Sequence, residues 1–332
     1  MIKDILSMTT TAFNAAYPYA GDFFRALVLP VPKSDCAMTV KEWILRLDYC
    51  LLDEMGVERE ELPDQLLLFI ENTERLQKES LLRVESLAAV GGHDKSGVPE
   101  AAALTVRSGE TVSVVGPTGS GKSRLLGDIE SLARGDTPSG RRILINGTVP
   151  PAGGRFSRSQ KLVAQLSQNM NFVADASVGE FIEIHCKSKY ITDVGKKTAE
   201  VLQAANRLAG EPFGPDTPVT ALSGGQSRSL MIADIVFLGN SPIVLIDEIE
   251  NAGIDRNRAV ELLSDTGHIV VMATHDPVLA LSARRRVVIR NGGIFKVIDT
   301  SEGEKSKLKE MMAMQNALTA CRDALKNGDS IA

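Results

Sequence analysis

Short, continuous apolar runs are the most regular pattern along the chain. IVLIDE at 243–248 and HIVVMATH at 268–275 each contain four or more consecutive apolar residues. Runs of this kind are typical of parallel strands that helices cover on both faces. Further strands are predicted for ALTV at 103–106, ETVSVV at 110–115 and RRILINGTV at 141–149. Together these runs predict an α/β fold.

The first 80 residues have a different, helical period. After Thr39, a suitable N-cap, apolar residues recur at helical spacing and predict one helix that ends near Gly56. A second helix is predicted from Asp64 to about Leu82, after Pro63. We therefore expect residues 1–80 to form a helical extension that either completes the core or binds a partner.

The remaining chain divides at two further changes of pattern. LLRVESL at 81–87 alternates and predicts an edge strand, and a mostly helical segment is expected within about 170–225. Residues 308–325 place apolar side chains at alternating spacings of three and four, which predicts a helix whose apolar face contacts the core or a dimer partner. The predicted organisation is an α/β domain at 81–300 and a C-terminal helix within 301–332.

Charge and composition exclude several classes of function. The net charge is −5 and the pI is about 5.6, so broad binding to nucleic acid is not expected. The cysteines are far apart in the sequence and form no metal or redox motif. The chain has no apolar run of the roughly 18 residues that a membrane span needs and no visible secretory signal. We expect a cytoplasmic protein that reaches a membrane only through a partner.

The sequence GPTGSGKS predicts a phosphate-binding loop. It follows an apolar strand and fits the pattern G-x-x-x-x-G-K-[ST], in which glycines let backbone amides surround phosphates at a helix N-terminus. Lys122 is expected to reach the β- and γ-phosphates of a nucleotide and Ser123 to bind Mg²⁺. The predicted nucleotide-binding residues here are Gly116, Pro117, Thr118, Gly119, Ser120, Gly121, Lys122 and Ser123.

Two acids end the apolar run IVLIDE. Asp247 is predicted to anchor Mg²⁺ directly or through water, and Glu248 to act as the general base for the water that attacks the γ-phosphate. With the loop above, these acids predict a P-loop nucleoside triphosphatase.

LSGGQ at 222–226 narrows the prediction, because it resembles the signature of the ATP-binding cassette (ABC) family. The resemblance implies a P-loop domain of ABC type, with a mixed sheet and a helical signature subdomain. It also implies a head-to-tail dimer that encloses two Mg-ATP, formed by two copies or with a second ABC subunit. The signature residues of one subunit then contact the γ-phosphate bound by the other; they are Ser223, Gly224, Gly225 and Gln226.

The same resemblance implies roles for three further residues. Gln168 matches the glutamine that senses the metal and the attacking water. His275 matches the histidine that contacts the γ-phosphate, and Asp255 matches an aspartate at the dimer interface.

The chain departs from the family pattern at a few positions. The aromatic residue that stacks on adenine is absent from the segment around Val90 and His93, so GTP is not excluded as a substrate. Ile249 follows the catalytic acids where most transporter subunits have proline, and Asp234 lies where an arginine is common.

The sequence leaves two functions open for an ATPase of this type. A soluble protein that remodels or activates another protein is slightly favoured, because of Ile249 and the helical extension. The alternative is the ATP-hydrolysing subunit of an ABC membrane transporter. A regulator without catalysis is disfavoured, since Lys122, Asp247, Glu248 and His275 are all present.

Overall fold

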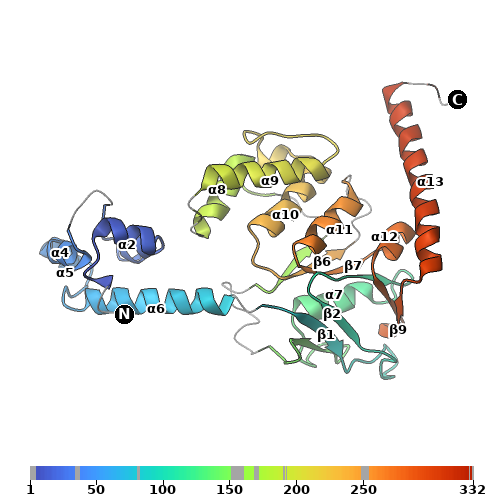
Figure 1. The fold of residues 1–332 in the computed structure, drawn as a ribbon. Helices are drawn as coiled ribbons and strands as arrows, with labels where there is room; N and C mark the ends of the chain where they lie inside the picture. The colour runs from blue at the N-terminus through green and yellow to red at the C-terminus, as the bar shows by residue number, and fades with distance from the viewer. Residues whose placement is uncertain are drawn as a thin grey trace. The chain divides into compact units, whose positions relative to one another are not determined.

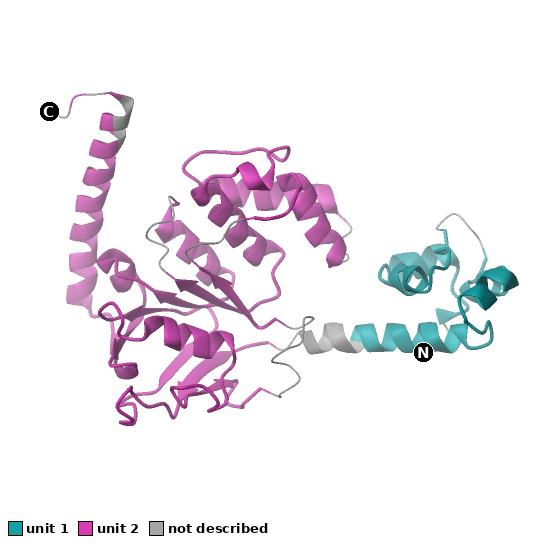
Figure 2. Cartoon of the chain, turned by 180° about the vertical axis from the view of Figure 1, so that it is seen from behind, with its two compact units in different colours: residues 1–82 teal, residues 83–332 magenta. Residues whose placement is uncertain are grey.

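The computed structural model describes residues 5–33, 38–80, 83–150, 161–167, 172–189, 191, 193–247, 254–328 and 330. The chain forms two compact units, Met1–Leu82 and Arg83–Ala332, shown in teal and magenta in Figure 2. Among these described residues, no helix is long and apolar enough to cross a membrane.

The first unit is built from helices around an aromatic core. Its helices include α2 (Thr10–Ala16), α3 (Ala20–Ala26), α4 (Val40–Leu45), α5 (Tyr49–Glu54) and α6 (Leu62–Ser80). Phe13 and Phe24 are fully buried, and the Phe24 ring lies 5.1 Å from that of Trp43. These contacts give the unit an apolar core of its own.

The single helix predicted between Thr39 and Gly56 is wrong, because the chain turns between α4 and α5. Thr39 does cap α4, with a reciprocal capping box to Glu42. Asp48 then starts a new helix, and its carboxylate accepts a bond of 3.0 Å from Cys50 N. Because the Asp48 side chain caps a backbone amide, a new helix begins at this residue and α4 does not continue through it.

The second unit contains two sheets. The larger has the order β5-β6-β7-β3-β8-β9 and is mixed, because only β9 pairs in antiparallel fashion. The smaller is antiparallel with the order β2-β1-β4. The strands are β1 (Ser86–Val90), β2 (Leu104–Arg107), β3 (Thr111–Val115), β4 (Arg142–Ile145), β5 (Val163–Leu166), β6 (Ile243–Asp247), β7 (Ile269–Ala273), β8 (Arg285–Arg290) and β9 (Gly293–Asp299).

The alternating segment that begins at Leu81 was predicted to be an edge strand, and this is wrong. β1 begins at Ser86 and lies between β2 and β4. Burial alternates along β1: Leu87 and Ala89 face the core, and their neighbours are only half-buried. A strand with one buried face therefore alternates even in the middle of a sheet.

Helices cover both faces of the larger sheet (Figure 1). α7 (Lys122–Glu130) packs between the two sheets, where its apolar side chains join one core with residues of β1, β3 and β4. α11 (Arg256–Asp265) and α12 (Pro277–Ser282) pack on the other face. β6 and β7 are thus covered on both sides, as their continuous apolar runs predict.

A helical region with its own core includes α8 (Val178–Ser188), α9 (Val194–Leu208) and α10 (Gly224–Phe237). Asp234 of α10 accepts a bond of 2.7 Å from the His185 ring of α8. Asp234, which lies where the family commonly has an arginine, therefore bonds to His185 and joins α8 to α10.

The last helix, α13 (Glu302–Asn327), carries the predicted apolar face, but that face is not part of the core. Met314, Leu318 and Leu325 are each at least 60% exposed. The later turns of α13 stand apart from the sheets in Figure 1, so packing against these sheets does not explain this face.

Glu304 fixes the start of α13 to β8 and gives a pH-dependent prediction. Its carboxylate accepts bonds from Arg286 (2.5 Å) and Ser301 N (2.9 Å), which lower the pKa of Glu304 from 4.5 to about 2. Because the folded pKa is depressed, the stabilisation is complete above the unfolded pKa and is lost as the pH falls toward 2.

We expect Glu304→Gln to lower the melting temperature at neutral pH and to match the wild type near pH 2. Melting curves recorded across this range measure the difference. Glu310→Gln, on an exposed part of the same helix, is the control. A difference that stayed constant with pH would contradict the assignment.

Candidate functional site

The predicted phosphate-binding loop connects β3 to α7 at the carboxyl edge of the larger sheet. Gly116 and Gly121 have φ values of 156° and 107°, which side chains with a Cβ rarely adopt. A Cβ at Gly116 would also lie 2.5 Å from Ile289 O. Gly121 caps α7 without a side-chain bond, so the first amides of this helix are suited to bind an anion.

Lys122 is 7% exposed, and its ammonium group lies inside the site. Nζ donates to Gly116 O at 3.1 Å and lies 3.0 Å from Nε2 of His275. An ammonium group has only donors, so Nε2 of His275 is the acceptor in this pair. The structure thus brings together two predicted site residues that are 153 positions apart in sequence.

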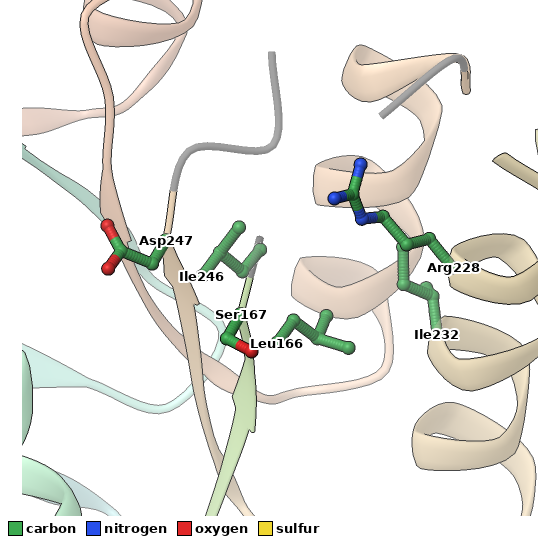
Figure 3. Close-up of a pocket in the computed structure, with 6 residues that line it drawn as sticks. All are labelled: Leu166, Ser167, Arg228, Ile232, Ile246 and Asp247. Carbon is green, nitrogen blue, oxygen red and sulfur yellow. The ribbon is translucent and has the colours of Figure 1, made fainter. Parts of the chain in front are cut away.

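Asp247 ends β6, two strands away from β3 in the same sheet. Parallel strands end at one edge, so its carboxylate is presented at the edge that holds the loop. Figure 3 shows this carboxylate on one side of β6 and Arg228 of α10 on the other, around a small pocket that Leu166, Ser167, Ile232 and Ile246 also line.

The oxygen atoms at this edge fit Mg²⁺. Ser123 is exposed at the start of α7, and Asp247 is partly exposed. A hydroxyl and a carboxylate are hard ligands, and Mg²⁺ commonly takes one or two such groups together with phosphate oxygens and water. No cluster of three His, Cys, Asp or Glu side chains in the described part of the chain could hold a metal by itself. This arrangement suits a metal that arrives with a nucleotide.

The signature residues lie at the start of α10. Ser223 caps the helix in a reciprocal box with Gln226, whose Oε1 accepts from Ser223 N at 2.9 Å. Nε2 of Gln226 donates to Glu211 O at 3.3 Å. The described hydrogen bonds of this cap remain within the helical region, and none reaches the phosphate-binding loop of the same chain. Gly224 and Gly225 form the first turn of α10, where backbone amides have no acceptor within the helix.

Asp255 caps α11, accepting from Arg258 N at 3.2 Å. The next residue, Arg256, forms an ion pair of 2.5 Å with Asp276. Asp276 follows His275 and caps α12. Sequence reasoning missed this pair, since its members come from different motifs and only the fold brings them together. It links α11, which follows the predicted interface aspartate, to Asp276, the residue after the predicted catalytic histidine.

Two predicted catalytic residues, Gln168 and Glu248, lie outside the described residues, as does Ile249. The segment expected to carry an adenine-stacking aromatic is described. Ala89 is fully buried, and Nδ1 of His93 lies 2.9 Å from Asp94 O.

Comparisons with known proteins agree in the kind of protein they identify. A family profile described as "ABC transporter" matches residues 100–251. An uncharacterized ABC transporter ATP-binding protein of Methanocaldococcus jannaschii is 51% identical over 253 residues, covering 75% of this chain and 96% of that protein. The phosphonates import ATP-binding protein PhnC of Escherichia coli K12 is 30% identical over 235 residues, covering 65% of this chain and 88% of that protein.

Among solved structures, CbiO1 from Clostridium perfringens, part of the ABC transporter complex CbiONQ, aligns with a TM-score of 0.50. The sequences are 20% identical, and the alignment covers 73% of this chain and 96% of that chain. This similarity concerns the fold alone.

Proposed function

Since the chain belongs to the ABC transporter ATP-binding protein family and is an ATP hydrolase of the ABC type, we propose that it is the ATP-hydrolysing subunit of a membrane transporter. The observation that carries this proposal is the 51% identity over nearly the whole of a relative described as a transporter ATP-binding protein. The PhnC relative, an import ATP-binding protein, supports the same function. The soluble remodelling role, which the sequence slightly favoured, is less well supported.

The geometry of the loop supports a specific mode of ATP binding. The amides at the start of α7 bind the phosphates, and Lys122 leaves its bonds to Gly116 O and His275 to contact the β- and γ-phosphates. Ser123 and Asp247 hold Mg²⁺, which when bound neutralises charge that develops on the phosphates. His275 is then released to contact the γ-phosphate.

Hydrolysis in this proposal needs a second subunit, either a copy of this chain or a related one. Ser223 and the neighbouring first-turn amides of α10 bind the γ-phosphate held by the other subunit. Glu248 accepts a proton from the attacking water. Once the γ-phosphate leaves, the contacts that favour the closed dimer are lost, and the subunits separate. A membrane-embedded partner converts this cycle into transport and holds the protein at the membrane surface.

Co-purification from the native cells in mild detergent tests the proposal. The Glu248→Gln variant is purified with ATP present, and accompanying proteins are identified by mass spectrometry. We expect a polytopic membrane protein, at levels well above those with Lys122→Ala as bait, since a chain that cannot bind ATP should not hold a closed complex. Recovery of only a soluble enzyme or assembly factor would overturn the transporter function and favour remodelling.

A further inference from the structure

We propose that the turn formed by Asn291 and Gly292, between β8 and β9, is a positioning element for the phosphate-binding loop, and that the buried Arg141 holds this turn in place. The inference rests on the proposed nucleotide-binding role of the loop. It assigns a role to residues that belong to none of the predicted motifs.

The turn touches the loop because their strands are neighbours. β3 and β8 pair in parallel, with Val115 opposite Val288, so the segments that follow them leave the sheet at the same edge. Gly292 N donates to Ser120 O at 2.7 Å. A Cβ at Gly121 would lie 2.8 Å from the Cα of Gly292. The two backbones are therefore in direct contact, and this approach requires glycine at position 121.

These contacts set the direction of an amide in the loop. The C=O and N–H of a trans peptide point in opposite directions. The bond from the turn to Ser120 O consequently directs Gly121 N–H away from the turn. Lys95 Nζ donates to the preceding carbonyl, Gly119 O, at 3.1 Å. With two successive carbonyls held from outside, the Gly121 amide is oriented before any phosphate binds.

The turn is held on one side by the segment that follows β1. Asn291 Nδ2 donates to Asp94 Oδ2 and to Ser96 Oγ, each at 3.0 Å. Asn291 O accepts from Lys95 N at 2.8 Å. The smaller sheet is thereby joined to the phosphate-binding loop through the turn.

Arg141 holds the turn on the other side. It is fully buried, and its Nη2 donates to Gly292 O at 2.6 Å. The same guanidinium forms ion pairs with Glu100 at 2.6 Å and with Asp128 at 2.7 Å, and both carboxylates are at most 3% exposed. Asp128 belongs to α7, the helix that starts at Lys122. One guanidinium thus fixes the turn to the helix that carries the site, which a lysine, with a single ammonium, cannot reproduce.

An ordinary structural turn would contribute to stability without affecting nucleotide binding, and the chain offers a matched control for this. Asn146, like Asn291, has a positive φ, 51° against 48°. Its side chain also ties a turn, accepting from Glu85 N at 2.8 Å and donating to Arg83 O at 2.9 Å. Glycine keeps either backbone conformation and removes only the side-chain bonds.

The experiment compares Asn291→Gly with Asn146→Gly in the full-length chain. We expect Asn291→Gly to raise the Kd for Mg-ATP about tenfold. In the nucleotide-free protein it should also speed hydrogen exchange in the peptide that contains residues 116–123. Asn146→Gly should lower the melting temperature but leave both values at the wild-type level. Arg141→Lys should act like Asn291→Gly, because the lysine cannot bond to the turn and to both carboxylates.

If Asn291→Gly lowers stability but leaves the Kd and the loop exchange unchanged, the positioning role is overturned. Equal effects of the two asparagine variants on the Kd would overturn it as well. Should the wild type bind no Mg-ATP, the proposed function fails, and exchange in the nucleotide-free loop still decides whether the turn positions it.

Discussion

Replacing Lys122 with alanine is expected to weaken Mg-ATP binding by at least about a hundredfold, the scale of losing a charged donor in a preorganised site. Lys122 is 7% exposed, and its ammonium group lies within bonding distance of Gly116 O and His275. Alanine removes the positive charge that the phosphates require. Equilibrium titration with a fluorescent ATP analogue measures the loss.

The control for Lys122→Ala is Lys307→Ala, which removes an exposed lysine that pairs with Glu310 within α13. It should bind Mg-ATP like the wild type. Melting temperatures of both variants show whether the fold is intact. A normal affinity in a folded Lys122→Ala protein would refute the assignment of the phosphate-binding loop.

Replacing Glu248 with glutamine is expected to lower the turnover of ATP by about 10² to 10⁴, the range for loss of a general base. Glutamine keeps the size of the side chain but cannot accept the proton. ATP binding should persist, because the loop at Gly116–Ser123 is unchanged. Size-exclusion chromatography with ATP should then show accumulation of a closed dimer.

Glu261→Gln, an exposed carboxylate on α11, is the control for this substitution and should hydrolyse ATP at the wild-type rate. Unchanged turnover by Glu248→Gln would refute its role as the base. Reduced turnover without a stable dimer would instead contradict the proposed sharing of ATP between two subunits.

The sequence predicted β6 and β7 well but missed β5, β8 and β9. A strand buried on both faces is apolar throughout, so its own residues identify it. β8 begins with Arg285 and Arg286, so its sequence lacks the continuous apolar run that identifies a buried strand. Arg285 pairs with Glu110 and Arg286 with Glu304, and both pairs form only after distant segments come together. The strand character of β8 was therefore hidden by tertiary ion pairs.

The break between α4 and α5 was missed for a related reason. Apolar residues continue at helical spacing through the break, and Leu47 is buried within it. Arg59, 12 residues later, bonds to the carbonyl of Leu47, which no longer has a helical partner. Local spacing could not show that this carbonyl is satisfied from another part of the chain.

The sequence by itself predicted the phosphate-binding loop and determined the strands with continuous apolar runs and the family, because each is encoded in contiguous residues with a defined order. Only the tertiary structure decided how the loop is supported. Glu100, Asp128, Arg141 and Gly292 come from four separate segments, and their types alone give no sign of pairing. A buried guanidinium needs several acceptors at fixed angles, and the fold supplies them by bringing Glu100, Asp128 of α7 and the β8–β9 turn to Arg141.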